Sequence, residues 1–128
     1  MAKYWFDHVH LVSKDPLKTA EFYEKSFARK ESVNTLPDGR TIVSLSFDRA
    51  SIKITNPRAK PLVPNTLPDG CGLEHFGIRT DNIEKTVAEL KAKGAKFVQE
   101  ITQVNPKTKI AFFVSPESIL IELLEVKG

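Results

Sequence analysis

The stretch that decides the fold is FDHVHLVSKD at residues 6–15, because LEHFGIRTD at residues 73–81 repeats its pattern. Each stretch has an acidic residue followed by histidine, then a short run typical of a β-strand, and then an aspartate suited to cap a helix. The two histidines, His8 and His75, stand about half the chain length apart. A pattern that recurs in this way indicates an internal repeat, so we expect two similar modules.

A helix is predicted after each aspartate. In the first, Asp15 is expected to be the N-cap and Pro16 to occupy the first helical position, where proline is best tolerated. In the second, Asp81 and Glu84 are predicted to form a capping box, and Gly94 to end the helix. The apolar stripes predicted to face the core are Leu17, Ala20, Tyr23 and Phe27 in one helix and Ile83, Val87 and Leu90 in the other.

Short strands follow each helix, so that each half has the order β-α-β-β-β and the fold class is α+β. The most regular strand-like runs are residues 41–47, 51–55, 110–114 and 119–126. We expect a single domain over residues 1–128, with module 1 at about 4–57, a proline-containing linker at 58–72 and module 2 at about 73–127.

Composition limits the partners and the location. The 128 residues carry a net charge of +3 without a basic stripe interleaved with aromatic residues, so nucleic acid is not an expected partner. No apolar run approaches the roughly 20 residues of a membrane-spanning helix, so a membrane is not expected either. The single cysteine, Cys71, cannot form an internal disulfide, which favours a reducing cytoplasm, and we expect its thiol to be inert.

Side-chain alternation along the strands places several polar groups on one face, away from the helices. In the first strand His8 and His10 share this face, and in the matching strand His75 and Arg79 do. In the last strand Glu122 lies on it between two leucines. A carboxylate in such surroundings is costly unless it is paired or bound to a metal.

Two imidazoles and one carboxylate on a shared face predict a divalent-metal site formed by His8, His75 and Glu122. The alternative is that Glu122 only forms an ion pair, either with Arg79 or with Lys53, its inward-facing counterpart in the first half. The repeat-equivalent of histidine 10 is a glycine, so that histidine is expected to contact the substrate or to support a ligand.

The pattern HVHLVSKD at residues 8–15, a following helix with Phe22 and Tyr23, and the closing stretch SPESILIEL at 115–123 resemble the vicinal oxygen chelate superfamily. This superfamily includes glyoxalase I, methylmalonyl-CoA epimerase, extradiol dioxygenases and the bleomycin- and fosfomycin-resistance proteins. The resemblance extends from about residue 6 to residue 126. It implies paired β-α-β-β-β modules whose mixed sheets curl around a metal site. It also implies a homodimer. The positions of His8, His75 and Glu122 match those of the family's metal ligands.

Three positions depart from particular members of that family. Lys53 stands where glyoxalase I has a fourth ligand, a glutamate, and Val12 stands where it has an arginine that binds the carboxylate of glutathione. Phe112 stands where the ring-cleaving dioxygenases have a tyrosine. These differences argue against glutathione as co-substrate, and they make a dioxygenase the second choice.

The function that the resemblance implies is a divalent-metal-dependent lyase or isomerase/epimerase. It would act through a metal-stabilised enediolate on a small substrate with two vicinal oxygens, and its cofactor would be one Zn, Ni, Mn, Co or Fe(II) ion. Glu122 or Lys53 is the expected proton-transfer group, and His10, Arg79 and Phe112 are the expected substrate contacts. Two alternatives stay open: a non-haem Fe(II) extradiol-type dioxygenase that cleaves a catechol-like ring, and a non-catalytic drug-binding resistance protein.

Overall fold

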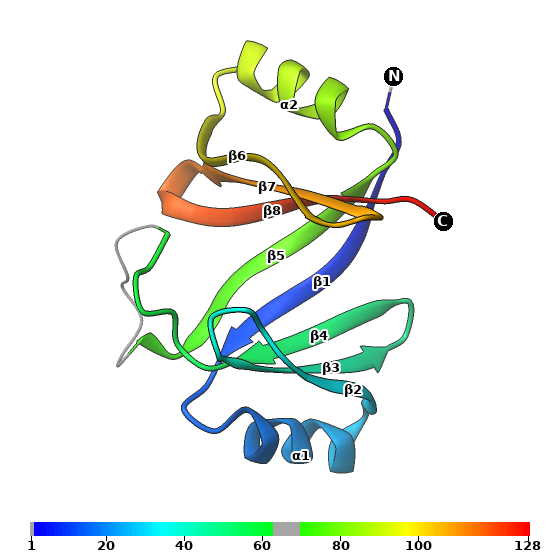
Figure 1. Cartoon of the computed structure of the whole chain (residues 1–128), viewed down its shortest axis with the longest axis vertical. Coiled ribbons are helices and arrows are strands. Elements are labelled where there is room, and N and C mark those ends of the chain that lie inside the picture. The colour runs from blue at the N-terminus through cyan, green and yellow to red at the C-terminus, as the bar shows by residue number, and fades with distance from the viewer. Residues whose placement is uncertain (1, 63–69) are drawn as a thin grey trace. The chain divides into compact units, whose positions relative to one another are not determined.

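The computed structural model describes residues 2–62 and 70–128, and its elements follow the predicted β-α-β-β-β order in each half (Figure 1). The first half has β1 (Tyr4–Val12), α1 (Pro16–Ser26), β2 (Arg29–Thr35), β3 (Thr41–Phe47) and β4 (Ala50–Thr55). The second half has β5 (Gly72–Thr80), α2 (Ile83–Ala92), β6 (Lys96–Asn105), β7 (Thr108–Ser115), a 3-10 turn (Pro116–Ser118) and β8 (Ile119–Val126). The α+β class and the repeated module are therefore confirmed.

Two compact units make up the chain. The first unit holds residues 8–74, and the second unit holds residues 1–7 together with 75–128. The beginning of β1 thus belongs to the second unit and the rest of β1 to the first. Part of the expected linker, residues 63–69, lies outside the described residues.

In the first unit the strands pair in the order β2-β3-β4-β1, with β1 parallel to β4 and the other pairs antiparallel. Helix α1 begins as predicted, because the Asp15 carboxylate accepts a hydrogen bond of 3.1 Å from the backbone N–H of Lys18 and Pro16 opens the helix. The core against α1 consists of Ala20, Val43, Leu45, Ile52 and Ile54.

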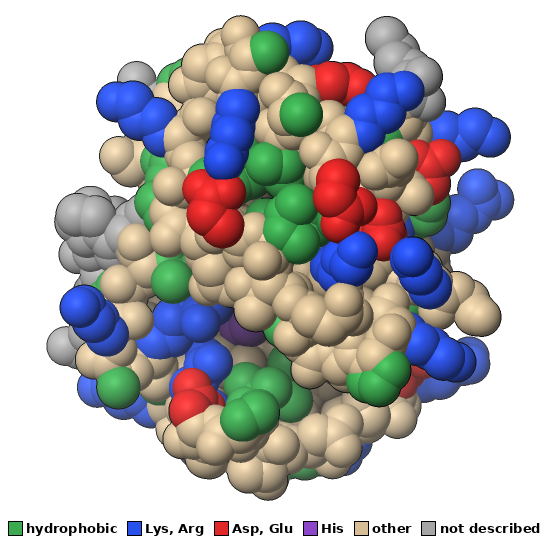
Figure 2. Space-filling view, turned by 45° about the horizontal axis from the view of Figure 1, so that its top comes forward, with side chains coloured by type: hydrophobic (Ala, Val, Ile, Leu, Met, Phe, Trp, Pro, Cys, Tyr) green, Lys and Arg blue, Asp and Glu red, His purple; other side chains and the backbone are tan. Residues whose placement is uncertain are grey.

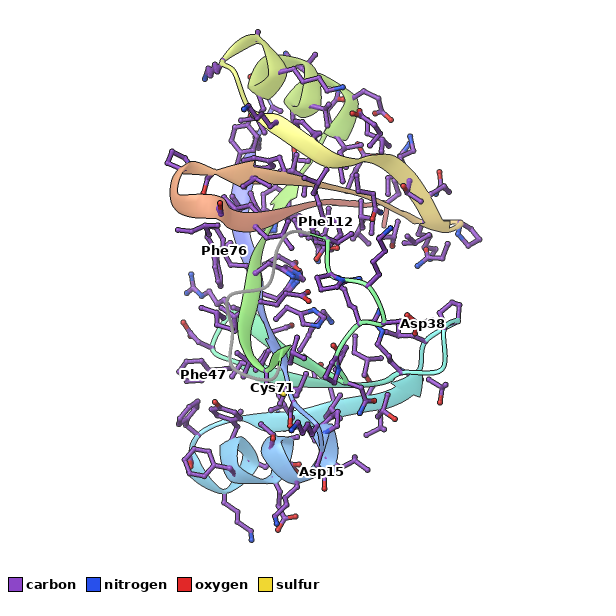
Figure 3. The ribbon with its side chains drawn as sticks, turned by 90° about the vertical axis from the view of Figure 1, so that its left-hand side faces the viewer. Asp15, Asp38, Phe47, Cys71, Phe76 and Phe112 are labelled. Atoms are coloured by element: carbon purple, nitrogen blue, oxygen red, sulfur yellow. The ribbon has the colours of Figure 1, made fainter. Side chains whose placement is uncertain are left out.

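The predicted apolar stripe of α1 is only partly correct. Ala20 is buried and Tyr23 packs against the core, but the side chains of Leu17 and Phe27 are 51% and 55% exposed. Phe27 instead lies beside Phe47 at the end of β3, with 4.8 Å between ring centroids, and Phe47 is labelled in Figure 3. Phe27 is the C-cap residue, one position beyond the last residue of α1, and its non-helical backbone takes it out of the helical stripe.

In the second unit the strands pair in the order β5-β8-β7-β6, again with one parallel pair, β5 and β8. Ile83 and Val87 of α2 pack as predicted against Ala111, Phe113, Ile121 and Leu123, and Leu90 joins the edge of this core. Outside the core, the side-chain hydrogen bond from Lys109 on β7 holds the pKa of the Glu84 carboxyl below its usual range. Gly94 follows the last turn with a φ of +94°, the left-handed conformation expected of a glycine that ends a helix.

The predicted capping box of α2 is wrong. The N-cap is Asn82, whose side-chain oxygen accepts a hydrogen bond of 3.1 Å from the N–H of Lys85. The Asp81 carboxylate instead accepts a hydrogen bond from the backbone N–H of Lys3. A second cap comes from the end of the chain, because the buried Glu125 carboxylate on β8 accepts a hydrogen bond of 2.9 Å from the N–H of Ile83.

We expect Glu125→Ala to lower the free energy of unfolding by about 1–3 kcal/mol, because the substitution leaves the buried N–H of Ile83 without its acceptor. Urea denaturation followed by far-UV circular dichroism measures the loss. Glu125→Gln is the matched control, since its amide oxygen can still accept the bond. Equal losses in both variants would contradict the capping role.

The surface is mixed in charge on the face shown in Figure 2, where lysine and arginine side chains are interspersed with aspartate and glutamate. Ion pairs at the surface include that of Lys91 with Glu100, at 2.7 Å. Neither helix in the described residues is long and apolar enough to cross a membrane.

Candidate functional site

One face of the first unit's sheet is lined by polar side chains, and we call it the polar face. Its polar residues on β1, β3 and β4 are His8, His10, Ser44, Ser46, Ser51, Lys53 and Thr55, and the apolar Val12 and Ile42 lie in the row of Thr55. The register of the strands explains the grouping. His8 on β1 pairs with Ser51 on β4, which pairs with Ser46 on β3. In the next row of this face, His10 pairs with Lys53, which pairs with Ser44. The alternating residues of β4, Ile52 and Ile54, point the other way into the core against α1.

His10 is held on the polar face by a buried hydroxyl. Its Nε2 atom lies 2.8 Å from Oγ1 of Thr55, whose side chain is fully buried at the end of β4. The ring of His8 lies edge-on nearby, with 6.4 Å between the two ring centroids. Thr55 was not predicted as a site residue, although it lies two positions beyond Lys53 and therefore on the same face of its strand.

Lys53 reaches along the same face. Its Nζ donates a hydrogen bond of 3.1 Å to Oγ of Ser44, the residue opposite it on β3. The prediction that this lysine faces away from the helix is consistent with that contact. Ser44 was also missed, because a serine in a strand carries no distinctive signal until the register is known.

In the second unit a histidine and a carboxylate meet. Nε2 of His75 on β5 lies 3.0 Å from Oε1 of Glu122 on β8, and both residues are buried, at 2% and 8% exposure. Gly77, two positions after His75, pairs in register with Glu122, which brings the two strands' inward side chains together.

The pair is enclosed by apolar groups. Phe112, labelled in Figure 3, lies opposite Glu122 on β7 and presents its ring edge-on to His75, with 5.1 Å between centroids. Phe112 is 3% exposed, and Leu120 beside the pair is also 3% exposed. Water is therefore largely kept from this histidine–carboxylate pair, and electrostatic interactions within it are strong.

The donor atoms of this pair fit a metal ion. The His75 nitrogen and the Glu122 oxygen lie at hydrogen-bond distance, 3.0 Å, and an imidazole nitrogen and a carboxylate oxygen are both ligands that zinc binds at about 2.0–2.2 Å. Each of the three histidines, at positions 8, 10 and 75, is buried and offers a ring nitrogen that can bind a metal. The chain thus supplies the imidazole and carboxylate ligands that such ions take.

Arg79 makes its contacts elsewhere in the second unit. Its Nε and an Nη atom both donate to Oδ1 of Asp7, at 3.1 and 2.8 Å. The alternative predicted from the sequence pairs Glu122 with Arg79 or Lys53. The carboxylate that Arg79 contacts is that of Asp7, the residue before His8 in the repeated motif.

Cys71, also labelled in Figure 3, lines a cavity of about 670 Å³ in the first unit. Ser13, Lys14, Thr19 and Tyr23 contribute to the same cavity. The hydroxyls of Ser13 and Thr19 bond to each other at 2.6 Å. Leu11 and Tyr23, two other lining residues, pack against the core under α1.

A family model described as the Glyoxalase/Bleomycin resistance protein/Dioxygenase superfamily matches residues 5–123. Among curated proteins, a probable chloroplastic lactoylglutathione lyase of Arabidopsis thaliana is 47% identical over 57 residues. That match covers 44% of this chain and 16% of the plant protein, so it spans a small part of the relative's length.

Solved structures share the fold at low sequence identity. A hypothetical protein of Bacillus halodurans superimposes with a TM-score of 0.83 at 23% identity, covering 98% of this chain and 96% of that one. A methylmalonyl-CoA epimerase variant of Streptomyces coelicolor, in complex with 2-nitronate-propionyl-CoA, gives a TM-score of 0.78 at 19% identity over 96% of this chain and 97% of its own. The epimerase of Mycobacterium tuberculosis gives 0.76 at 20% identity over 96% and 88%.

Proposed function

Because the chain belongs to the Glyoxalase/Bleomycin resistance protein/Dioxygenase superfamily, we propose that it is a divalent-metal-dependent lyase or isomerase/epimerase. Its substrate would be a small molecule that carries two neighbouring oxygen atoms. The observation that carries this proposal is the buried pair of His75 and Glu122, whose donor atoms are 3.0 Å apart in apolar surroundings. Burial of a carboxylate is costly, and a bound cation is one of the few partners that offset the cost.

The proposed ligands are His8, His75 and Glu122. His8 is the repeat counterpart of His75, and it is 1% exposed, which supports a structural or ligand role rather than a surface one. All three lie on strands, whose rigidity holds ligand atoms in place better than loops do. A divalent ion held by them would supply Lewis-acid polarisation of the substrate's oxygens.

The other residues of the two faces would bind the substrate and move its proton. Glu122 would take the proton from the carbon next to a carbonyl, and Glu122 or the ammonium group of Lys53 would return one. His10, fixed by Thr55, and Phe112, packed edge-on against His75, would limit the orientations open to the substrate. Arg79, which lies on β5 with His75 and contacts Asp7, would complete the substrate contacts.

Assembly and location complete the proposal. We expect the chain to form a homodimer. We also expect it to be cytoplasmic, because a chain with a single cysteine has no internal disulfide that would need an oxidising compartment. Light scattering coupled to size-exclusion chromatography measures the mass directly. A monomer at micromolar concentration would contradict the expected dimer.

Proton exchange in D₂O tests the reaction. The chain, loaded in turn with Zn, Ni, Mn, Co or Fe(II), is incubated with a panel of 2-hydroxycarbonyl compounds and acyl thioesters, among them methylmalonyl-CoA and lactoylglutathione. We expect loss of the substrate's α-proton signal in ¹H NMR only with metal present, and none with Glu122→Ala.

Two results would redirect the proposal. Oxygen uptake with catechols by the anaerobically reconstituted Fe(II) form, without proton exchange, would indicate the dioxygenase. A protein that stays metal-free through purification without chelators, and that catalyses no exchange after loading, would indicate the drug-binding alternative. Glu100→Gln, at an exposed residue of β6, is the control for the Glu122 substitution.

A further inference from the structure

We propose that the polar face of the first unit binds a carboxylate group of the substrate, with Lys53 as its cation and Ser44 as a hydroxyl partner. The substrate class would then be a small carboxylic acid anion rather than a neutral carbonyl compound. This inference rests on the proposed function in placing a substrate at this face, but the charge recognition has its own test.

The charge on the polar face is unbalanced. Among the polar residues that β1, β3 and β4 place on this face, Lys53 is the one lysine or arginine and none is a carboxylate; Arg29, in register with Ser46, is exposed on the edge strand β2. The structure forms no ion pair between Lys53 and an acidic residue within 2–62 and 70–128; its contact is the neutral hydroxyl of Ser44 at 3.1 Å. A half-buried ammonium group with a neutral partner gains from an anion that enters from solution.

Lys53 lies on a strand whose backbone is held firmly within the sheet. β4 lies between β3 and β1, so its backbone is hydrogen-bonded on both sides. Ile52 and Ile54 anchor the strand in the core on the opposite face. The ammonium group therefore projects from a rigid strand, as a group that recognises a small anion should.

Hydroxyl groups surround the cation. Ser44 lies opposite Lys53, while Ser46 and Ser51 form the next row on the same face, and all three are half-buried. Each serine can donate one hydrogen bond to a carboxylate oxygen. Thr55 is engaged with His10, so the serines are the donors left to an incoming anion.

The repeat makes the assignment specific to this unit. The corresponding face of the second unit carries Glu122 among Ile110, Phe112, Val114, Leu120 and Leu124, and it has no hydroxyl in these rows. Lys53 and Glu122 occupy matching places in the last strands of the two modules. Arg79 shares the face of Glu122, but its guanidinium already donates two hydrogen bonds to the Asp7 carboxylate. Recognition of a substrate carboxylate therefore falls to the first unit.

Titration with malonate tests the proposal on the full chain, freed of metal with EDTA, with amide shifts followed in ¹H–¹⁵N NMR spectra. We expect malonate to shift amides of β3 and β4, while malonamide, which has the same size without charge, leaves them in place. Lys53→Met should weaken malonate binding by at least about tenfold, and Lys53→Arg should keep it within about threefold. Ser44→Ala should weaken it by a smaller factor.

Lys18→Met is the matched control, because Lys18 lies on α1, which packs on the opposite side of the sheet. Unchanged malonate affinity in Lys53→Met, equal binding of malonamide, or no shift by malonate would each overturn the proposal. If Lys53→Met does not fold, Lys53→Gln and Ser44→Ala decide in the same way. Metal content of the wild-type chain, measured separately, keeps the two proposals distinct. A wild-type chain that binds no metal refutes the proposed function, whereas loss of malonate binding in metal-free Lys53→Met still supports the carboxylate site.

Discussion

Replacing His75 with alanine will abolish stoichiometric metal binding. The wild-type chain, purified without chelators or an affinity tag, is expected to retain one divalent ion, and the variant to bind it at least about a hundredfold more weakly, which exceeds the cost of losing a group that merely supports a ligand. The reason is that Glu122, which lies 3.0 Å from His75, would lose its imidazole neighbour in a site closed to water. Elemental analysis after dialysis, followed by competition with a chromophoric chelator, measures both stoichiometry and affinity.

His10→Ala is the matched control for that experiment. His10 is also a buried histidine, but its Nε2 contacts Thr55, and we assign it to substrate contact. We expect this variant to keep its metal. Loss of metal from His10→Ala would show that His10 is itself a ligand, and retention of metal by His75→Ala would refute the proposed ligand set.

Leu45→Ala is expected to lower the free energy of unfolding by about 2–5 kcal/mol, the usual cost of truncating a buried leucine. Leu45 on β3 is fully buried and packs with Ala20 of α1 and with Ile52 beside it on β4. The substitution leaves a cavity beneath α1, where the surrounding strands can relax little. Urea denaturation with far-UV circular dichroism measures the change in midpoint and slope.

Leu17→Ala tests the same chemical change on the surface. Leu17 lies in the helix stripe that the sequence predicts to be buried, but its side chain is 51% exposed. We expect a change within about 0.5 kcal/mol, as for other surface substitutions. A loss comparable to that of Leu45→Ala would mean that Leu17 is covered in solution, for example by a second copy of the chain.

Most of the local structure could be predicted because its signals are short-range. Asp15 and Pro16 begin α1 and Gly94 ends α2, since capping depends on residues within one turn. Strand alternation identified the faces of β8, where Ile121 and Leu123 pack on α2. The cap of α2 by Glu125 could not be predicted in this way, because 42 positions separate the carboxylate from the N–H that it accepts.

In the candidate site, too, the features that depend on nearby residues could be predicted, and the contacts between distant residues could not. Alternation and repetition in the sequence select His8, His75 and Glu122 as inward-facing donors, because the period of two along a strand is a property of the backbone itself. Only the pairing of strands brought His75 to Glu122, Lys53 to Ser44 and His10 to Thr55, since register between strands depends on packing across the whole sheet. The sequence thus determined which chemistry the chain carries, and the tertiary structure decided which groups meet.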